Sequence, residues 1–257
     1  VARQLILSIA PLQLIDPGIH RLVEEGPLHR RRWVDWGVFH VEPGFIRTWG
    51  DYVRALKQRN AALKQGLSTD PWDPELARLG ETLAVSRQTL LEALHPEWEA
   101  ICGRLLGGLA LDWSFHRGWS QEHSLSESLA LHRARDRERG TTGVGPHRFD
   151  VALKVDGRLA REVLSRGQQK LLGASMALAM ARLAARSFSA RRPILLLDDP
   201  AAELDRDRTR LLIDEMADLS CQLIVTSLDA NRPEFGPPER AFHVEQGPGA
   251  GVRGWER

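Results

Sequence analysis

Two adjacent carboxylates stand at the end of a short apolar run late in the sequence. The run RPILLLDD, residues 192–199, is typical of a strand buried on both faces, and it ends in Asp198 and Asp199. Ligands of open α/β sheets bind at the carboxyl edge of such strands. Asp198 is therefore placed to hold Mg²⁺, which keeps much of its water shell, and Asp199 to orient an attacking water. The alternative is an ordinary capped loop after a strand.

A candidate phosphate site lies upstream, where the segment LSRGQQK, residues 164–170, opens a long helix. Ser165 and Gly167 combine a hydroxyl group with backbone N–H groups at the positive end of the helix, which favours a phosphate. The alternative is that Ser165 is only the N-cap of the helix. A third segment, AELD at residues 202–205, follows the two aspartates. Each segment alone is a weak signal, but the three in this order are specific.

These three segments together resemble the ATP-binding cassette ATPases. LSRGQQ is similar to the signature motif of that superfamily, LLLDD to its Walker B strand, and AELD to the D-loop that crosses its dimer interface. In the superfamily, the signature of one subunit closes over the nucleotide held by the other. The resemblance therefore implies a homodimer that forms on ATP, with Asp205 at the seam. It also implies that a partner's γ-phosphate is contacted by the signature residues Ser165, Arg166, Gly167 and Gln168.

Three further segments narrow the resemblance to the RecF family. They are EGPLHRRRWVDW at residues 25–36, ALKQRNAALK at 55–64 and GVGPHRFD at 143–150, and the first two are segments that most other cassette ATPases lack. The match runs from about Leu12 to Ser227. It implies a cytoplasmic, SMC-like ATPase of recombinational repair and replication restart, with ATP and Mg²⁺ as cofactors. Such proteins bind single-stranded DNA and gapped duplexes, work with RecR and RecO, and help to load RecA.

Three features depart from the pattern of the family. The phosphate-binding loop GxxxxGK[ST] does not occur, because none of the four lysines in the sequence follows a glycine. We therefore expect a chain that starts downstream of that loop and binds ATP poorly by itself. Asp199 stands where most cassette ATPases have glutamate, and Thr226 and Ser227 stand where a switch histidine is expected. Both differences predict at most a weak ATPase, so whether this chain is an enzyme stays open.

Cationic residues gather in the first quarter of the sequence, although the formal net charge of the whole chain is only +1. Arginine and lysine side chains grouped in this way suit the phosphates of a nucleic acid. The alternative is a solvated face with salt bridges inside the domain. Farther along, His147 and Arg148 are interpreted as stabilising their loop rather than as catalytic. The candidate DNA-binding residues are Arg30, Arg31, Arg32, Arg54, Lys57, Arg59 and Lys64.

The elements that must position these residues follow from hydrophobic periodicity and turn signals. Asp156-Gly157 predicts a tight hairpin turn. Helices are expected at about residues 51–64, 74–95, 96–106, 166–186 and 206–219. Residues 3–15 are expected to form a strand followed by an extended piece, and further strands are expected at about residues 149–155, 192–199, 222–227 and 240–244. This alternation predicts an α/β fold.

The composition is that of an ordinary globular chain. Its 257 residues are 42% hydrophobic and 27% charged, which is ample for a core. No apolar run is long enough to span a bilayer, so no membrane association is expected, and two cysteines make a disulfide framework implausible. With the resemblance, the pattern predicts the C-terminal part of an ATPase head of the cassette and SMC type. Its expected parts are a remnant of the N-terminal ATPase half at 1–20, a helical lobe at 21–125 and the C-terminal ATPase half at 126–257.

Three hypotheses for the function stand at this point. The first is a RecF-type ATPase, and the second is a non-catalytic remnant that binds only DNA or partner proteins. The third is another cassette ATPase, such as the motor of a transporter. The segment RRRWVDW at residues 30–36 and the lack of a recognisable coupling segment argue against the third hypothesis.

Overall fold

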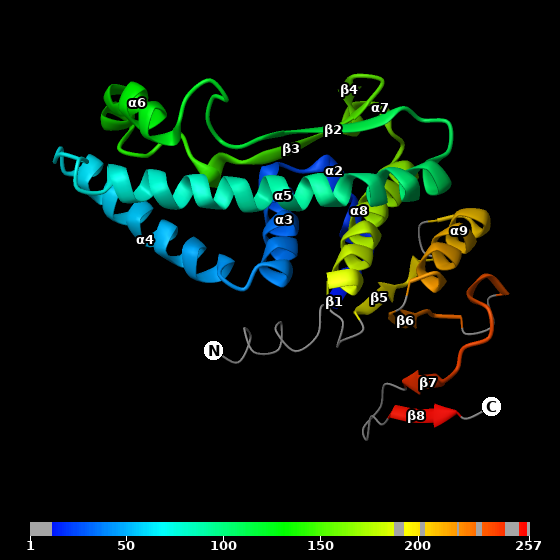
Figure 1. Cartoon of the computed structure of the whole chain (residues 1–257). Coiled ribbons are helices and arrows are strands. Elements are labelled where there is room, and N and C mark those ends of the chain that lie inside the picture. Colours follow the sequence, from blue (N-terminus) through cyan, green and yellow to red (C-terminus); the bar gives the residue numbers. More distant parts are fainter. Residues whose placement is uncertain are drawn as a thin grey trace.

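The computed structural model describes residues 12–187, 193–200, 204–219, 221–229, 233–244 and 252–255. One long helix, α5 (Asp73–Leu106), extends along most of the molecule, and the other elements pack along its sides (Figure 1). No helix in these ranges is both long and apolar enough to cross a lipid bilayer. The other helices are α2 (Arg21–Glu24), α3 (Pro27–Val41), α4 (Phe45–Lys64), α6 (Leu125–Arg139), α7 (Ala160–Val163), α8 (Arg166–Ser187) and α9 (Arg206–Ala217).

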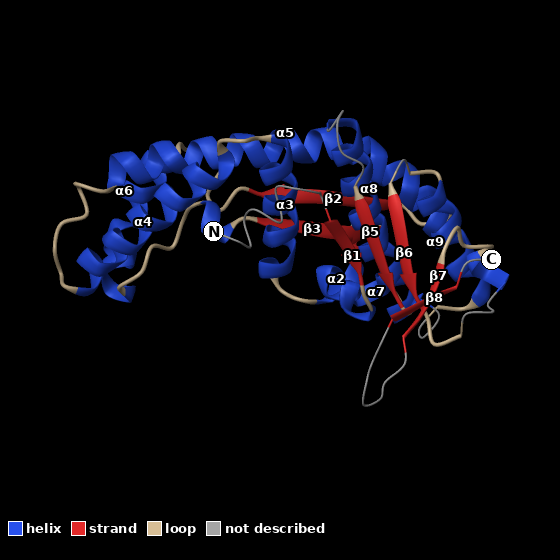
Figure 2. Cartoon of the chain, turned by 90° about the horizontal axis from the view of Figure 1, so that it is seen from below, coloured by secondary structure: helices blue, strands red, loops and turns tan. Residues whose placement is uncertain are grey.

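The described strands form three small sheets. The first has the order β1-β5-β6, and both of its pairings are parallel. The second has the order β2-β3-β4 and is antiparallel, and β7 pairs with β8 as an antiparallel ribbon. Figure 2 shows the strands of the parallel sheet side by side, with α8 packed against it. The strands are β1 (Leu12–Ile15), β2 (Leu111–His116), β3 (Asp150–Val155), β4 (Arg158–Leu159), β5 (Ile194–Asp198), β6 (Gln222–Thr226), β7 (Ala241–Val244) and β8 (Val252–Trp255).

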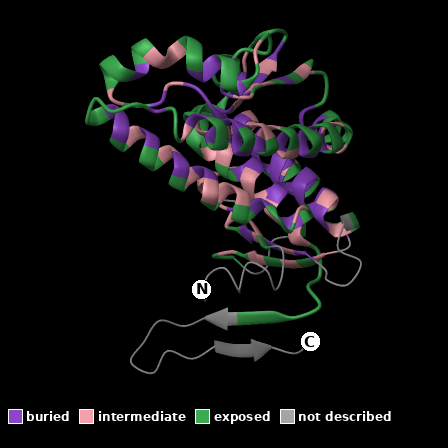
Figure 3. Ribbon diagram, turned by 60° about the vertical axis from the view of Figure 1, so that its left-hand side comes forward, coloured by how far each residue is buried: buried purple, intermediate pink, exposed green. Residues whose placement is uncertain are grey.

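The core lies between α5, α8 and the sheets, where buried residues line the inner faces of the ribbon (Figure 3). Helix α8 is apolar nearly all round, as the sequence predicts, because it packs against α5 on one side and the parallel sheet on the other. Gly173 permits one close approach: a Cβ atom there would lie 2.6 Å from the carbonyl oxygen of Ile19. Any larger residue at this position would push α8 away from the segment that follows β1.

The prediction of two helices meeting at Pro96 is wrong, because α5 continues through this proline. A proline inside a helix costs about 3 kcal/mol, since it removes one hydrogen bond and crowds the preceding turn. Beyond it, Trp98, Ile101 and Cys102 are buried; Trp98 stacks on Trp113 of β2, and Cys102 contacts Ser175 of α8. Burying each such side chain contributes about 1.5–3 kcal/mol, so packing outweighs the local cost. Helices α3 and α6 and strand β2 are among the elements that were not predicted from sequence.

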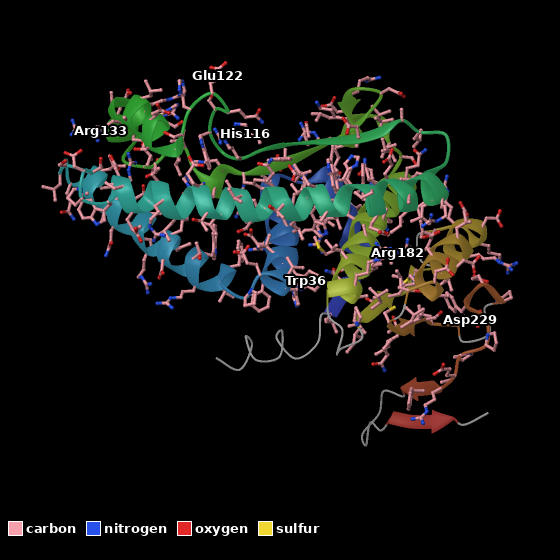
Figure 4. The ribbon with its side chains drawn as sticks, viewed as in Figure 1. Trp36, His116, Glu122, Arg133, Arg182 and Asp229 are labelled. Atoms are coloured by element: carbon pink, nitrogen blue, oxygen red, sulfur yellow. The ribbon has the colours of Figure 1, made fainter. Side chains whose placement is uncertain are left out.

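Helices α4, α5 and α6 are tied together by a buried arginine. The guanidinium group of Arg59 is fully buried and donates to carboxylates of Asp73 and Asp136 and to the hydroxyl group of Thr142. Arg133, labelled on α6 in Figure 4, adds ion pairs at the surface of this cluster. The result is an extended helical arm that projects from the sheets (Figure 1).

Candidate functional site

The carboxyl ends of β1, β5 and β6 meet at one edge of the parallel sheet. In the strand register, Ile15 pairs with Leu197 and Thr226 pairs with Asp198. Asp16 follows β1 directly, so three polar side chains from distant parts of the sequence stand at neighbouring strand ends. This edge is where ligands of open α/β sheets bind.

Asp198 and Asp199 are both held by Thr226. The hydroxyl group of Thr226 donates to Oδ1 of Asp198 over 2.5 Å, while the N–H of Asp199 donates to the carbonyl oxygen of Thr226 over 3.2 Å. Asp199 has a φ of 39°, a left-handed conformation that is uncommon for residues other than glycine, asparagine and aspartate. Such a backbone is found where the surrounding structure fixes it, often at functional sites. Sequence reasoning treated Thr226 only as the replacement for a histidine and missed its contact with Asp198.

A small cavity of about 30 Å³ lies beside the two aspartates, large enough for ordered water. Asp16 from the end of β1 and Lys170 from α8 also line it. Burial, together with the nearby positive charge of Arg166, lowers the pKa of Lys170. Lys170 belongs to the LSRGQQK segment, so the fold brings the end of that segment to the aspartates. Sequence reasoning read Asp16 as a turn residue, and only the strand order places it at this site.

The donor atoms at this edge fit magnesium in kind. Mg²⁺ is commonly held by one or two carboxylates while water and phosphate oxygens complete its shell. The carboxylate of Asp198 is exposed at the strand end, where such a shell has room. Among the residues described by the structure, no group of three or more His, Cys, Asp or Glu side chains is arranged to hold a metal ion.

The first turn of α8 forms a reciprocal cap. The N–H of Gln168 donates to Oγ of Ser165 over 3.4 Å, and the N–H of Ser165 donates to Oε1 of Gln168 over 3.0 Å. This is a capping box, in which two unsatisfied helical donors are paired by side chains. The N-cap role considered for Ser165 is therefore confirmed within the chain. Because Ser165 and Arg166 remain exposed, the cap does not prevent a contact with a second molecule.

Arg208, which follows Asp205 in the first turn of α9, lies over Gly167. Asp205 caps α9 by accepting the N–H of Arg208 over 2.9 Å, and its side chain remains mostly exposed. The guanidinium group of Arg208 leans over the first turn of α8, where a Cβ atom on Gly167 would lie 2.9 Å from its Nη1 atom. The structure thus brings the signature segment next to the helix that AELD opens.

The seven candidate DNA-binding residues divide by burial. Arg30 is buried and binds both carboxylate oxygens of Asp150, and Arg59 is fully enclosed. Neither presents its guanidinium group to solvent. Arg31 is half-buried and donates to the carbonyl oxygen of Phe149, and burial lowers its pKa. The exposed members are Arg32, Arg54, Lys57 and Lys64.

His147 stabilises its loop, as its position in the sequence predicted. Its Nδ1 atom accepts a 2.7 Å hydrogen bond from the hydroxyl group of Tyr52, and its Nε2 atom donates to the carbonyl oxygen of Thr142. Burial lowers the pKa of His147 to about 4, and burial also raises the pKa of Tyr52. The histidine is therefore neutral and joins α4 to the loop before β3. Arg148 is exposed.

Solved structures give the fold of the chain. It superposes on the recombination mediator protein RecF-ATP in the RecFOR pathway with a TM-score of 0.82, at 20% identity, covering 97% of this chain and 69% of that one. The corresponding RecF-ATPrS structure gives a TM-score of 0.79 at 21% identity, covering 92% and 66%. The SmcHead bound to the C-winged helix domain of ScpA matches at a TM-score of 0.50, with 16% identity, over 95% and 55%. The fold is that of an ATPase head of the RecF and SMC type.

Curated relatives give the family. The DNA replication and repair protein RecF of Pseudomonas fluorescens strain Pf-5 is 40% identical over 252 residues, which cover 94% of this chain and 68% of that protein. RecF of Yersinia pestis bv. Antiqua is 39% identical over 247 residues, with the same coverage. A scan against models of protein families gives no match. At this identity and coverage, the chain belongs to the RecF family of DNA replication and repair proteins.

Proposed function

We propose that this chain is a RecF-type, ATP-dependent DNA-binding protein of recombinational repair and replication restart. The observation that carries the proposal is the strand-end site, where Thr226 orients Asp198 beside Asp199 at the carboxyl edge of the parallel sheet. In this function the protein acts in the cytoplasm on single-stranded DNA and gapped duplexes. RecR and RecO are its partners, and it helps to load RecA.

At the nucleotide, Asp198 is the residue that holds Mg²⁺ and Asp199 the one that orients the attacking water. The bound magnesium supplies positive charge to the phosphate oxygens. The hydrogen bond from Thr226 fixes the orientation of the Asp198 carboxylate, and the backbone of Asp199 turns out of the strand conformation with a left-handed φ. The shorter reach of aspartate at residue 199 supports slow rather than fast hydrolysis.

Across a homodimer formed on ATP, the capped start of α8 faces the γ-phosphate held by the partner. Backbone N–H groups and the positive end of a long helix favour that anion. Asp205 then lies at the seam, next to the same surface. The residues offered to the partner's nucleotide are Ser165, Arg166, Gly167 and Gln168, of which the first two are exposed in the single chain.

DNA binding is proposed for the exposed basic face of the helical arm. Lys57 and Lys64 on α4 lie two turns apart and are both exposed. A Cβ atom on Gly140 would lie 3.4 Å from Cγ of Lys64, so the end of α6, with exposed Arg137 and Arg139, continues this face. Together with Arg32 and Arg54 these cations suit the phosphates of a duplex or single strand. Arg30 and Arg59 are left out because their guanidinium groups are enclosed.

One observation favours a second candidate, a protein that binds DNA or partner proteins without hydrolysis. The 257 residues contain no GxxxxGK[ST] loop, whose backbone and lysine cradle the β- and γ-phosphates in other P-loop proteins. We therefore expect calorimetric titration of this chain with ATP and Mg²⁺ to show weak binding or none. Tight stoichiometric binding would contradict the claim that half of the phosphate site lies outside these residues.

The aspartates are tested in a fusion protein that places the family's N-terminal phosphate-binding segment ahead of Val1. We expect Asp198→Asn to weaken Mg²⁺-dependent nucleotide binding, because the ligand charge is lost. Asp199→Asn should spare binding and lower hydrolysis, since asparagine tolerates the left-handed backbone but cannot accept a proton. Asp214→Asn, an exposed carboxylate on α9, is the control. If both site variants hydrolyse ATP at the parental rate, the strand-end assignment is wrong.

The DNA-binding face is tested by salt dependence. Each phosphate neutralised on duplex DNA contributes about 0.9 to the slope of log affinity against log salt concentration. We expect Lys57→Gln with Lys64→Gln to lower that slope by about 1–2, measured by fluorescence anisotropy on a gapped duplex. Arg210→Gln, a highly exposed cation on α9, should leave it unchanged. An unaltered slope in the double variant, or an equal loss in the control, would remove this face from the DNA interface.

A further inference from the structure

Strand β2 leaves one edge of the antiparallel sheet unpaired. Its six residues pair with β3 on one side only, and within the described chain no strand lies on the other side. Such an edge presents a row of backbone donors and acceptors that another strand can complete. The strand lies near the stretch of α5 from Leu91 to Pro96, in the C-terminal half of that helix (Figure 1).

The phase of the ladder shows which groups face outward. The N–H of Asp156 donates to the carbonyl oxygen of Ala110, so this pair and every second pair after it are the hydrogen-bonded ones. The N–H and C=O groups of Trp113 and Phe115 therefore point away from β3. The N–H of Trp113 is taken by Oδ1 of Asp112, which confirms this direction. No bond from a described residue occupies the N–H of Phe115.

A groove of about 540 Å³ runs between this edge and α5. Its walls are apolar where Leu91, Trp113 and Phe115 meet. Pro96 also lines the groove. Its ring nitrogen carries no hydrogen, so it cannot donate the regular helical hydrogen bond to the carbonyl oxygen of Glu92, four residues earlier. The groove thus combines an apolar floor with backbone groups that lack their regular partners.

The carboxylates around the groove outnumber its one basic lining side chain, His95, whose ring nitrogens lie 4.0 Å from carboxylate oxygens of Glu99 and Asp112. Glu92 lines the groove and is exposed, and the carboxylate of Asp112 on β2 is about two-thirds exposed. Glu99 is exposed two turns farther along α5 than Glu92. This excess of negative charge selects a basic ligand.

We propose that the β2 edge and this groove form a docking site for an extended peptide segment of a partner protein. The segment adds to β2 as a further strand, places an apolar side chain over Phe115 and Pro96, and carries basic residues on either side. Main-chain bonds to Phe115 give the affinity, and the alternate side chains give the specificity. The site lies on a different sheet from the aspartates, so it does not depend on the nucleotide chemistry.

The test uses the whole chain and a labelled, acetylated heptapeptide of alternating arginine and valine with a central phenylalanine. We expect saturable binding by fluorescence anisotropy, and at least tenfold weaker binding of the same peptide with glutamate in place of arginine. Amide hydrogen exchange at Phe115 should slow at least tenfold at saturation, whereas the amide of Ala152, already bonded to β2, should not change. Glu92→Gln with Asp112→Asn should reduce the preference for the basic peptide, and Glu75→Gln, at the far end of α5, should not.

Three outcomes would overturn the proposal. Equal affinity for the two peptides would remove the role of charge. Unchanged exchange at Phe115 while the basic peptide is bound would place the peptide elsewhere. Protection of Phe115 that rises with protein concentration, without peptide, would assign the edge to a second copy of this chain instead.

Discussion

Two roles of the Ser165 side chain, capping helix α8 and contacting a partner's phosphate, can be distinguished by substitution. Ser165→Ala removes the hydroxyl group that accepts the N–H of Gln168. Loss of an N-cap costs about 0.5–2 kcal/mol, and the exposed position favours about 1 kcal/mol. For a chain of this size that corresponds to a fall in Tm of about 2–4 °C. Scanning calorimetry of the chain measures this part of the effect.

Ser165→Asp then distinguishes the two roles. Aspartate caps a helix about as well as serine, and its charge is favourable at this end of the helix. The variant should therefore keep the parental Tm. A negative side chain facing a γ-phosphate is repulsive, however, so in the fusion protein Ser165→Asp should abolish dimerisation on ATP. Nucleotide binding by the monomer should stay intact.

Sedimentation of the fusion protein with and without ATP measures dimerisation, and a direct binding assay measures nucleotide affinity. The two measurements together decide between the roles. If Ser165→Asp still dimerises on ATP, Ser165 does not face the phosphate and serves only as a cap. If Ser165→Ala and Ser165→Asp lower Tm equally, the reciprocal cap with Gln168 does not hold the start of α8. Gln168→Ala is the companion variant, because it removes the other half of the cap without placing charge at the site.

Three further predictions concern stability and reactivity. Burial lowers the pKa of His147 from 6.5 to about 4, so the folded state resists protonation of this side chain. The free energy of unfolding should therefore be complete above pH 6.5 and fall by about 3 kcal/mol as the pH drops toward 4. Urea titrations over that range measure the decline, and a His147 that titrates near pH 6.5 by NMR would contradict it. Arg59→Leu should destabilise by about 3–5 kcal/mol because it leaves the buried carboxylate of Asp136 without its ion pair, whereas Arg54→Leu, at an exposed pair, should cost under about 1 kcal/mol; similar midpoints in urea would refute the difference. Burial raises the pKa of the Cys102 thiol to about 12, so iodoacetamide at pH 8 should modify Cys221 before Cys102. Mass spectrometry measures the two rates of modification, and equal rates would show that Cys102 is accessible.

Local pattern was sufficient for the elements that carry the site. The apolar run before Asp198 produced β5, and the segment LSRGQQK produced the start of α8. The turn at Asp156-Gly157 formed as predicted, with both residues at positive φ. In each case the signal lies within a few residues, because turn chemistry, capping and buried strands are decided by near neighbours. The resemblance to RecF rested on the first two of these segments together with residues 25–36, 55–64 and 143–150, and it agrees with the curated relatives.

Tertiary packing decided which residues share a site and which are free. Charge type alone grouped Arg59 with Lys57 and Lys64, yet the fold encloses Arg59 between two helices as the tie of the arm. Periodicity alone ended a helix before Pro96, yet contact with α8 carries α5 through it. Such outcomes depend on partners dozens of residues away, whose burial outweighs local preference.

The site at the ends of the parallel strands also combines features that local sequence predicts with features that only the fold creates. The sequence by itself determined that two carboxylates follow a buried strand. Only the order β1-β5-β6 brought Asp16 and Thr226 to them, because parallel strands distant in sequence end at one edge of a sheet. The hydrogen bond from Thr226 that orients Asp198 is therefore a property of the folded sheet rather than of the motif.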